Sequence, residues 1–287
     1  MNSLTIRAYA KINLTLDVGE RRPDGYHSIR SIMQTIALHD TLTVTLTPDI
    51  SGVRLEVIGE KAAGVPADAS NLVHRAASLL AGPESGLHIL LHKRIPSQAG
   101  LGGGSSDAAA TIWAVNTLRG LGLSSEQLAD RSAALGADVP FFFTGGTALV
   151  EGLGELITPL PPLTPPWVLV LAKPSVGVST AAAYAALDAV TDRIPRAATA
   201  AWLRGKERLS NDFEPVISGG SSAIAAILAS FRRTAESGEC FRPLLCGSGA
   251  TVFCRVSTVE KAEQIAEQLR KTRGVSAWVS TTQEAAG

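Results

Sequence analysis

The chain has 287 residues, of which 45% are hydrophobic and 18% are charged. This composition is typical of a globular protein with enough apolar material for buried cores, and it is unlike that of a disordered chain. Lys plus Arg and Asp plus Glu both total 26, so no global field would attract a nucleic acid backbone or an acidic membrane. An anionic ligand would have to be bound by local features.

The cysteines Cys240, Cys246 and Cys254 form no Cys-x-x-Cys pair and leave an odd thiol, which indicates a reducing compartment. No segment has 18 uninterrupted apolar residues, and the N-terminal pattern is unlike a signal peptide. We therefore expect a cytoplasmic protein, a monomer or weak homodimer, with a small molecule as its partner and neither nucleic acid nor membrane. No set of metal ligands stands out in the sequence.

The hydrophobic periodicity before residue 160 predicts strands first and helices mostly after them. The strands are expected at 4–18, 41–47, 53–58 and 87–93, and the helices at 71–80, 105–118 and 125–134.

The proline-rich segment 159–166, PLPPLTPP, cannot sustain a helix or a central strand and should be a stiff connector. It divides the chain into two predicted domains, 1–160 and 161–287. After it, strands are expected at 167–172, 250–256 and 275–279, and helices at 179–188, 221–231 and 258–271. This mixed order indicates an α+β fold.

Lys11 and Asn13 lie two positions apart on the polar face of the first predicted strand. Alternation of apolar and polar residues is the ordinary pattern of an antiparallel sheet with one wet face. The same spacing would also direct a cation and an amide into one cleft. The segment alone leaves both interpretations open.

A glycine-rich loop, IPSQAGLGGGSSD at 95–107, connects a predicted strand to an alanine-rich helix. Glycines let backbone N–H groups approach an anion, and a helix start adds free donors and a positive dipole end. A flexible linker would not run from an apolar strand through a proline straight into a helix. The loop therefore predicts a polyphosphate site.

Two common nucleotide loops do not fit this segment. A Walker A loop needs a lysine after its last glycine, and GxGxxG starting at Gly100 fails because Ser105 stands at the third glycine. The proline-initiated GLGGGSSDA segment instead resembles the ATP loop of the GHMP kinases. The resemblance implies that ATP is bound by Pro96, Ser97, Gln98, Ala99, Gly100, Leu101, Gly102, Gly103, Gly104, Ser105 and Ser106, with Asn71 on the adenine side.

Asp138 stands in the segment GADVPFF, two residues before Pro140, where on local grounds it could equally be a helix N-cap or a catalytic acid. The segment resembles the one that supplies the acid facing the acceptor hydroxyl in the 4-diphosphocytidyl-2-C-methyl-D-erythritol kinases. The AKINL segment at 10–14 is similar to the one that supplies their neighbouring lysine. The resemblance implies that Asp138 and Lys11 are the catalytic residues.

The resemblance to this family extends along the chain. RPDGYH at 22–27, NLV at 71–73, NDFEP at 211–215 and GSGA at 247–250 are similar, in this order, to further family segments. Each is weak alone, since an asparagine at a helix start is often a cap and a glycine pair is often a plain turn. Together they imply the two-domain GHMP kinase fold, with a ribosomal-protein-S5-like N-terminal domain that binds ATP and an α/β-sandwich C-terminal domain.

The resemblance also implies an acceptor pocket. His27 would hydrogen-bond the cytosine edge, and Tyr184 and Tyr26 would stack on the base, while Thr180 and Asn13 complete the substrate-binding set. On local grounds His27 could be a surface-loop histidine and Tyr184 a core aromatic of an amphipathic helix.

Two residues depart from the family pattern. Met33 stands where some members have an aromatic residue near the base, and Gln98 stands where the family often has a small residue. Neither departure removes a catalytic group.

The reaction implied is in-line transfer of the ATP γ-phosphoryl group, assisted by Mg²⁺, to the 2-hydroxyl of 4-diphosphocytidyl-2-C-methyl-D-erythritol. A carboxylate is a weak base for an alcohol, so orientation by Asp138 should matter as much as proton removal. Two alternatives remain: a GHMP kinase acting on a sugar, homoserine or mevalonate-type alcohol, and a catalytically silent nucleotide-binding regulator of the same fold.

Overall fold

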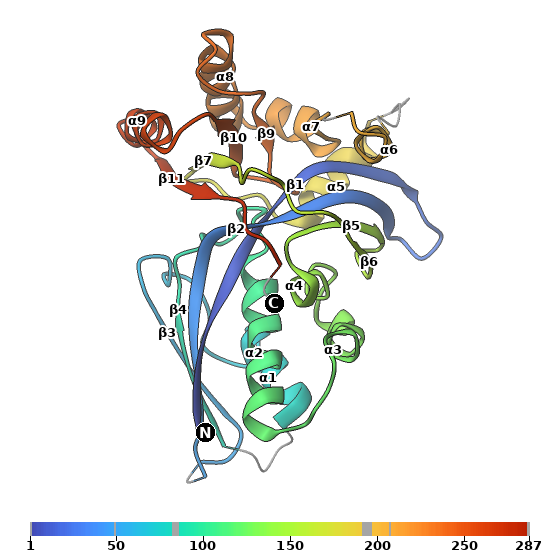
Figure 1. Cartoon of the computed structure of the whole chain (residues 1–287), viewed down its shortest axis with the longest axis vertical. Helices are drawn as coiled ribbons and strands as arrows, with labels where there is room; N and C mark the ends of the chain where they lie inside the picture. Colours follow the sequence, from blue (N-terminus) through green and yellow to red (C-terminus); the bar gives the residue numbers. More distant parts are fainter. Residues whose placement is uncertain (1, 49, 82–85, 191–196, 207, 286–287) are drawn as a thin grey trace.

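The structure is a computed structural model that describes residues 2–48, 50–81, 86–190, 197–206 and 208–285. Two sheets and the helices packed on them make up the molecule, which confirms the predicted α+β class (Figure 1). The elements of the first half are β1 (Ser3–Arg21), β2 (His27–Leu46), β3 (Val53–Ile58), α1 (Leu72–Ala81), β4 (Leu87–His92), α2 (Gly103–Arg119), α3 (Ser125–Ser132), the 3₁₀-helix η1 (Ala133–Leu135), α4 (Phe141–Thr144), β5 (Thr147–Gly152) and β6 (Leu156–Pro159).

The second half adds a smaller sheet and its covering helices. Its elements are β7 (Val168–Pro174), α5 (Thr180–Asp188), α6 (Ala198–Leu203), β8 (Ser210–Asn211), α7 (Phe213–Gly220), α8 (Ser222–Glu236), β9 (Leu244–Leu245), β10 (Val252–Val256), α9 (Val259–Arg270) and β11 (Val275–Thr281).

The larger sheet has seven strands in the order β3-β4-β2-β1-β8, with β5 pairing the first half of β2 and β6 pairing β5. The long strand β2 therefore serves two partners, β5 through 29–34 and β4 through 41–46. The smaller sheet has the order β11-β7-β10-β9. Strand β8, from the second half of the chain, lies parallel to β1.

One of the hydrophobic cores joins the two sheets, while others cover a single sheet. One cluster packs Ala10, Ile12 and Leu14 of β1 with Leu169 and Leu171 of β7. A second, under α1 and α2, covers the β3–β4 side of the larger sheet, and a third lies between the smaller sheet and helices α5 and α7 to α9.

The middle of the polar face of β1 is buried, unlike the wet face that simple alternation suggests. Lys11 and Asn13 are 3% and 1% exposed, because β1 lies between β2 and β8 and its middle is covered by the glycine loop. A buried lysine and amide need partners, and both have them.

The connector after β6 is irregular up to β7, as its prolines predict, and Pro159 itself is paired with Ala148 at the edge strand β6. An edge strand tolerates proline because one side of its backbone needs no donor. The division into domains 1–160 and 161–287 stays a prediction.

In the described part of the chain no single helix has the length and hydropathy to cross a membrane. The bent pair α7–α8, with 117° between its two helices, has that length and composition only when both helices are taken together.

Candidate active site

A cavity of ≈ 610 Å³ lies where the glycine loop, the middle of β1, the turn before α4 and the start of α5 meet. Most of the residues proposed from sequence line it: Lys11, Asn13, Asn71, Pro96, Ser97, Gln98, Ala99, Gly100, Leu101, Gly102, Gly103, Gly104, Ser105, Asp138, Thr180 and Tyr184. Three do not: Ser106 is buried in the first turn of α2, Tyr26 is 64% exposed outside the cavity, and His27 is buried behind Tyr184.

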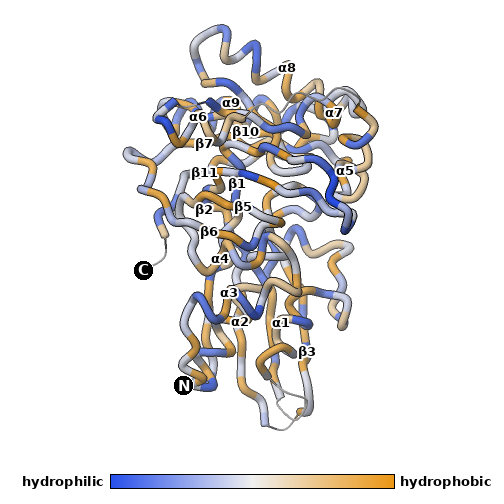
Figure 2. Tube along the Cα trace, turned by 90° about the vertical axis from the view of Figure 1, so that its right-hand side faces the viewer, coloured by the Kyte–Doolittle hydropathy of each residue, from blue (hydrophilic) through white to orange (hydrophobic). Residues whose placement is uncertain are grey.

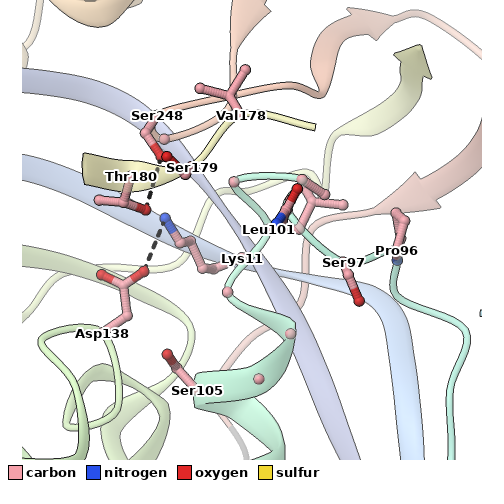
Figure 3. Close-up of a pocket in the computed structure, with 18 of the residues that line it drawn as sticks. Lys11, Pro96, Ser97, Leu101, Ser105, Asp138, Val178, Ser179, Thr180 and Ser248 are labelled. Atoms are coloured by element: carbon pink, nitrogen blue, oxygen red, sulfur yellow. Dashed lines mark hydrogen bonds and ion pairs between the residues drawn. The ribbon is translucent and has the colours of Figure 1, made fainter. Parts of the chain in front are cut away.

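Lys11 and Asp138 meet at the cavity although they come from distant segments. The Lys11 Nζ atom lies 3.3 Å from Asp138 Oδ2, and Figure 3 shows the two side chains pointing toward each other. The Lys11 side chain is 4% exposed and that of Asp138 is 31% exposed. A nearly buried cation thus faces a carboxylate that remains open to the cavity.

Asp138 is not a helix cap. The residue at the N-cap position of α4 is Pro140, and no side chain caps that helix. Asp138 instead lies in the turn between η1 and α4, which presents its carboxylate to Lys11. The structure therefore removes the capping alternative that the local sequence left open.

A chain of hydrogen bonds through β1 and β2 fixes the position of the Lys11 ammonium. Its ammonium donates to Asn13 Oδ1 at 2.8 Å, the Asn13 amide donates to Ser31 Oγ at 2.8 Å, and the Ser31 hydroxyl donates to the Thr15 carbonyl at 2.5 Å. Ser31 is fully buried on β2. Sequence analysis did not identify Ser31, because only the pairing of β1 with β2 brings it to Asn13.

The glycine loop ends in an uncapped helix. Gly102 occupies the N-cap position of α2 with φ 69°, and no side chain satisfies the first N–H groups of the helix. These free donors and the positive end of the helix dipole face the cavity and suit an anion. Figure 3 shows Ser105 at this helix start, directed toward the space below Lys11 and Asp138.

Backbone contacts fix the loop in place. The Lys11 N–H donates to the Leu101 carbonyl at 2.9 Å, and the Thr251 N–H donates to the Ala99 carbonyl at 3.1 Å. Gly100 has φ 74°, and a Cβ atom there would collide with the Cys246 carbonyl oxygen. The left-handed backbone and the close approach both require glycine.

Asn71 caps the N-terminus of α1, as its position directly before the helix suggests. Its Oδ1 accepts from the Val73 N–H at 2.9 Å and its amide donates to the Pro66 carbonyl at 2.6 Å. The side chain is thus a cap that also lines the cavity, and its predicted contact with adenine stays a prediction. Gln98, with φ 49°, packs against Gly177 beside the same cavity.

A buried charged cluster lies beneath the loop and was missed in the sequence. The Lys93 ammonium donates to Asp40 at 2.5 Å and to Asp107 at 2.7 Å, and all three residues are at most 4% exposed. Burial raises the pKa of Asp107 to about 8, with Lys93 opposing and Asp40 adding to the rise. Burial lowers the pKa of Lys93, but the two carboxylates outweigh it and raise the pKa overall.

This cluster ties three elements together at the loop. Asp40 also accepts from the N–H groups of Arg94 and Ile95, where the glycine loop begins, while Asp107, the last residue of the loop, lies on α2. The signal in the sequence was Lys93, three residues before the proline of the loop, and Asp107, directly after its two serines.

The NDFEP segment fastens the second glycine loop, GSGA at 247–250. Asn211 donates to the carbonyls of Leu245 and Gly247, both at 2.8 Å, and its Oδ1 accepts from the Phe213 N–H. Asp212 accepts from the Val18 N–H at 2.9 Å. These residues have structural roles that position the cavity wall beside Lys11.

The start of α5 forms the wall opposite the phosphate loop. Ser179 caps the helix, and Thr180 Oγ1 lies 3.3 Å from Ser248 Oγ. Both residues line the cavity together with Lys11 and Asp138 (Figure 3). Tyr184, one turn further, has its pKa raised to about 12 by burial and by the negative charge of Asp138. Met33 lines the same region and packs on Phe141.

Comparisons with known proteins agree with this geometry. The profile described as "GHMP kinases N terminal domain" matches residues 71–146, which include the glycine loop and Asp138. The chain is 46% identical to the 4-diphosphocytidyl-2-C-methyl-D-erythritol kinase of Moorella thermoacetica, over 95% of this chain and 96% of the relative. It is 43% identical to the kinase of the same name from Geobacter metallireducens, over 94% and 95%.

Solved structures are similar to this one over nearly the whole chain. A crystal structure of 4-(cytidine 5'-diphospho)-2C-methyl-D-erythritol kinase superposes with a TM-score of 0.78 at 33% identity, covering 99% of this chain and 100% of that one. The mevalonate kinase of L. major, at 15% identity, shares the fold with a TM-score of 0.71 over 100% and 98% of the two chains. The chain belongs to the 4-diphosphocytidyl-2-C-methyl-D-erythritol kinase family of the GHMP kinases.

Proposed function

We propose that this chain transfers the γ-phosphoryl group of ATP to the 2-hydroxyl of 4-diphosphocytidyl-2-C-methyl-D-erythritol, giving the 2-phosphate and ADP, in the non-mevalonate route to isoprenoid precursors. The observation that carries the proposal is the Lys11–Asp138 pair, 3.3 Å apart, at the edge of a cavity that also contains the open N-terminus of α2. Family membership supplies the acceptor.

The transfer forms a bond from the acceptor oxygen to the γ-phosphorus as the bond from that phosphorus to the β–γ bridging oxygen breaks. Asp138 orients the hydroxyl and accepts its proton, as the exposure of its carboxylate to the cavity supports. Lys11 stabilises that carboxylate and offsets negative charge on the transferring group. The loop 96–106 and the first turn of α2 bind the β- and γ-phosphates through backbone N–H groups and Ser105.

The acceptor would occupy the side of the cavity formed by α5. Thr180 and Asn13 contact its polar middle, Tyr184 stacks on the cytosine, and His27 and Tyr26 reach the base from the β1–β2 turn. The positions of Thr180, Asn13 and Tyr184 in the cavity wall support this arrangement. Met33 gives that wall a flexible side chain rather than an aromatic ring.

Mg²⁺ would accompany the nucleotide, neutralising charge on its crowded phosphate oxygens. The described residues contain no group of three or more His, Cys, Asp or Glu side chains that could hold a metal ion by themselves. The Ser105 hydroxyl and the Asp138 carboxylate line the cavity beside the free N–H groups of α2. This oxygen set fits an ion held chiefly by the nucleotide, the common arrangement for Mg²⁺.

We propose a cytoplasmic monomer or weak homodimer that acts on small molecules alone and divides into an N-terminal ATP-binding domain, 1–160, and a C-terminal domain, 161–287. Three free, buried cysteines and equal numbers of acidic and basic residues support a reducing compartment and the lack of a polyanionic partner.

The test is ADP formation from ATP and Mg²⁺ with four acceptors offered separately: 4-diphosphocytidyl-2-C-methyl-D-erythritol, homoserine, mevalonate and galactose. We expect turnover with the first acceptor alone, and a product carrying phosphate on the 2-hydroxyl by phosphorus and proton NMR. Turnover of another acceptor would reassign the substrate, and ATP binding without any transfer would favour a silent regulator.

A further inference from the structure

The His27 side chain is held by three contacts beside the cavity rather than in it. Its ring stacks on Tyr184 with 5.1 Å between centroids and 25° between planes. Its Nδ1 atom lies 3.0 Å from the Gly19 carbonyl oxygen, and its Nε2 atom lies 3.0 Å from Asp188 Oδ1. The side chain is 5% exposed.

These contacts engage the parts of His27 and Tyr184 that a planar base would use. One face of the Tyr184 ring is covered by His27, and the ring makes a T-shaped contact with Phe213, whose centroid is 5.0 Å away at 89°. Both nitrogens of His27 face protein oxygens. A heterocycle could stack on that face of Tyr184 only after the histidine ring has moved away.

The contact with Asp188 is the weakest of the three. Nε2 is buried, yet it makes no aligned hydrogen bond despite its 3.0 Å approach to the carboxylate. Asp188 is the last residue of α5 and its side chain is 35% exposed. A poorly aligned contact with a partly exposed carboxylate is easily exchanged, because water competes for the carboxylate and the buried nitrogen gains a partner when a ligand supplies one.

We propose that Asp188 is a positioning residue of the acceptor site, which holds the His27 ring over Tyr184 until a base takes the place of the carboxylate. Binding exchanges the Asp188–His27 contact for a base–His27 contact and frees the Tyr184 face. The inference rests on the proposed function, since it concerns the cytosine subsite of that acceptor.

The neighbourhood permits this movement. His27 follows a hydrophilic turn at the end of the β1–β2 hairpin, which lies beside α5 (Figure 2). Gly25 in this turn has φ 86°, and Tyr26 exposes its ring to solvent. Tyr26 is adjacent to His27 in the chain, so a shift of His27 off Tyr184 would also move Tyr26.

The experiment is calorimetric binding of cytidine 5'-diphosphate and, separately, inorganic pyrophosphate, with a non-hydrolysable ATP analogue filling the phosphate loop. The proteins are the wild type, Asp188→Ala, Asp188→Asn and the control Glu151→Gln. Glu151 pairs with Arg30 at 2.9 Å and is 38% exposed, so its substitution removes a similar exposed charge from a site outside the cavity lining.

We expect Asp188→Ala and Asp188→Asn to bind cytidine 5'-diphosphate about two- to fivefold more tightly than the wild type, the range for loss of a partly exposed contact with a carboxylate. Pyrophosphate binding should not change, and Glu151→Gln should match the wild type. In turnover assays the acceptor KM should fall by the same factor while kcat and the KM for ATP stay constant.

Unchanged or weaker binding of cytidine 5'-diphosphate by both Asp188 variants would overturn the inference, as would the absence of binding by all four proteins. Failure of the proposed function is distinguishable, because it would show as a wild type that does not phosphorylate the acceptor. Tighter cytidine binding by the Asp188 variants would support the exchange whichever alcohol is phosphorylated.

Discussion

Ser31→Ala tests whether the hydrogen-bond chain beneath Lys11 positions the catalytic cation. The substitution removes one hydroxyl that accepts from the Asn13 amide and donates to the Thr15 carbonyl. Asn13 is 1% exposed, so its amide would lose its partner with little access to water. An orphaned buried donor costs about 1–3 kcal/mol, more than the hydrogen bond itself contributes.

The stability effect follows from this magnitude. For a chain of this size each kcal/mol shifts the melting temperature by roughly 2–4 °C, so Ser31→Ala should melt about 2–12 °C lower. Activity should fall as well, because an Asn13 amide that turns to find a new partner no longer accepts from Lys11. We expect kcat to fall about three- to tenfold, with the KM for ATP within about twofold of wild type.

The measurements are thermal unfolding by circular dichroism and ADP release with 4-diphosphocytidyl-2-C-methyl-D-erythritol. Ser78→Ala is the matched control, since Ser78 is an exposed helical serine whose hydroxyl donates to the His74 carbonyl at 3.0 Å. Its melting temperature and kcat should equal those of the wild type. A Ser31→Ala protein that also matches the wild type in both would refute the view that this chain of bonds positions Lys11.

Three further substitutions test the loop and its supports. Gly102→Ala places a side chain at φ 69°, with its Cβ 3.0 Å from Lys11 Cγ; the strain of about 1–2 kcal/mol should raise the KM for ATP roughly 5- to 30-fold in steady-state assays. Because burial raises the pKa of Asp107 from 3.8 to about 8, the folded protein keeps a proton that the unfolded chain loses, and stability should fall as pH rises from about 4 to 8. Asp107→Asn should flatten that decline in melting temperature, and an equally steep decline would contradict the assignment. Asn211→Ala removes both bonds that fasten the 247–250 loop and should lower the free energy of unfolding by about 1–3 kcal/mol, measured by urea titration.

The sequence predicted the parts of the site that lie within one local motif. The glycine loop followed by α2 was predicted because strand, turn and helix start are contiguous, and the helix begins at Gly103 rather than at Ser105. The starts of α5 and α9 were likewise predicted to within one residue. Their capping residues, Ser179 and Thr258, accept hydrogen bonds from backbone N–H groups in the first turn of each helix. Local backbone chemistry is enough for such features.

Other elements were missed because their local signals conflict. The sequence predicted only 41–47 of the strand that runs from His27 to Leu46, since the turn residues before it and a mixed polar pattern obscured its first half. Helix α7 contains Pro215 in its first turn and ends in two glycines, residue types that usually interrupt a helix, so no helix was predicted there. Strand β5 follows a glycine pair and is defined by its pairing with β2.

The meeting of distant residues had no local signal. Nothing in the periodicity of β1 selects Asp138 as the partner of Lys11, and only the resemblance to family segments joined the two. The buried contact of Lys93 with Asp40 and Asp107 and the contact of His27 with Asp188 arise from tertiary packing. Burial and pairing together decide what such side chains do, and neither is visible in a linear pattern.

The most direct test of the central claim compares ADP release from ATP, Mg²⁺ and 4-diphosphocytidyl-2-C-methyl-D-erythritol for the wild type, Asp138→Ala and Lys11→Ala. We expect kcat to fall about 10²- to 10⁴-fold in each variant, while folding and ATP binding persist. Folded variants that bind ATP and keep most of the wild-type rate would contradict the assignment of Lys11 and Asp138 as the catalytic pair.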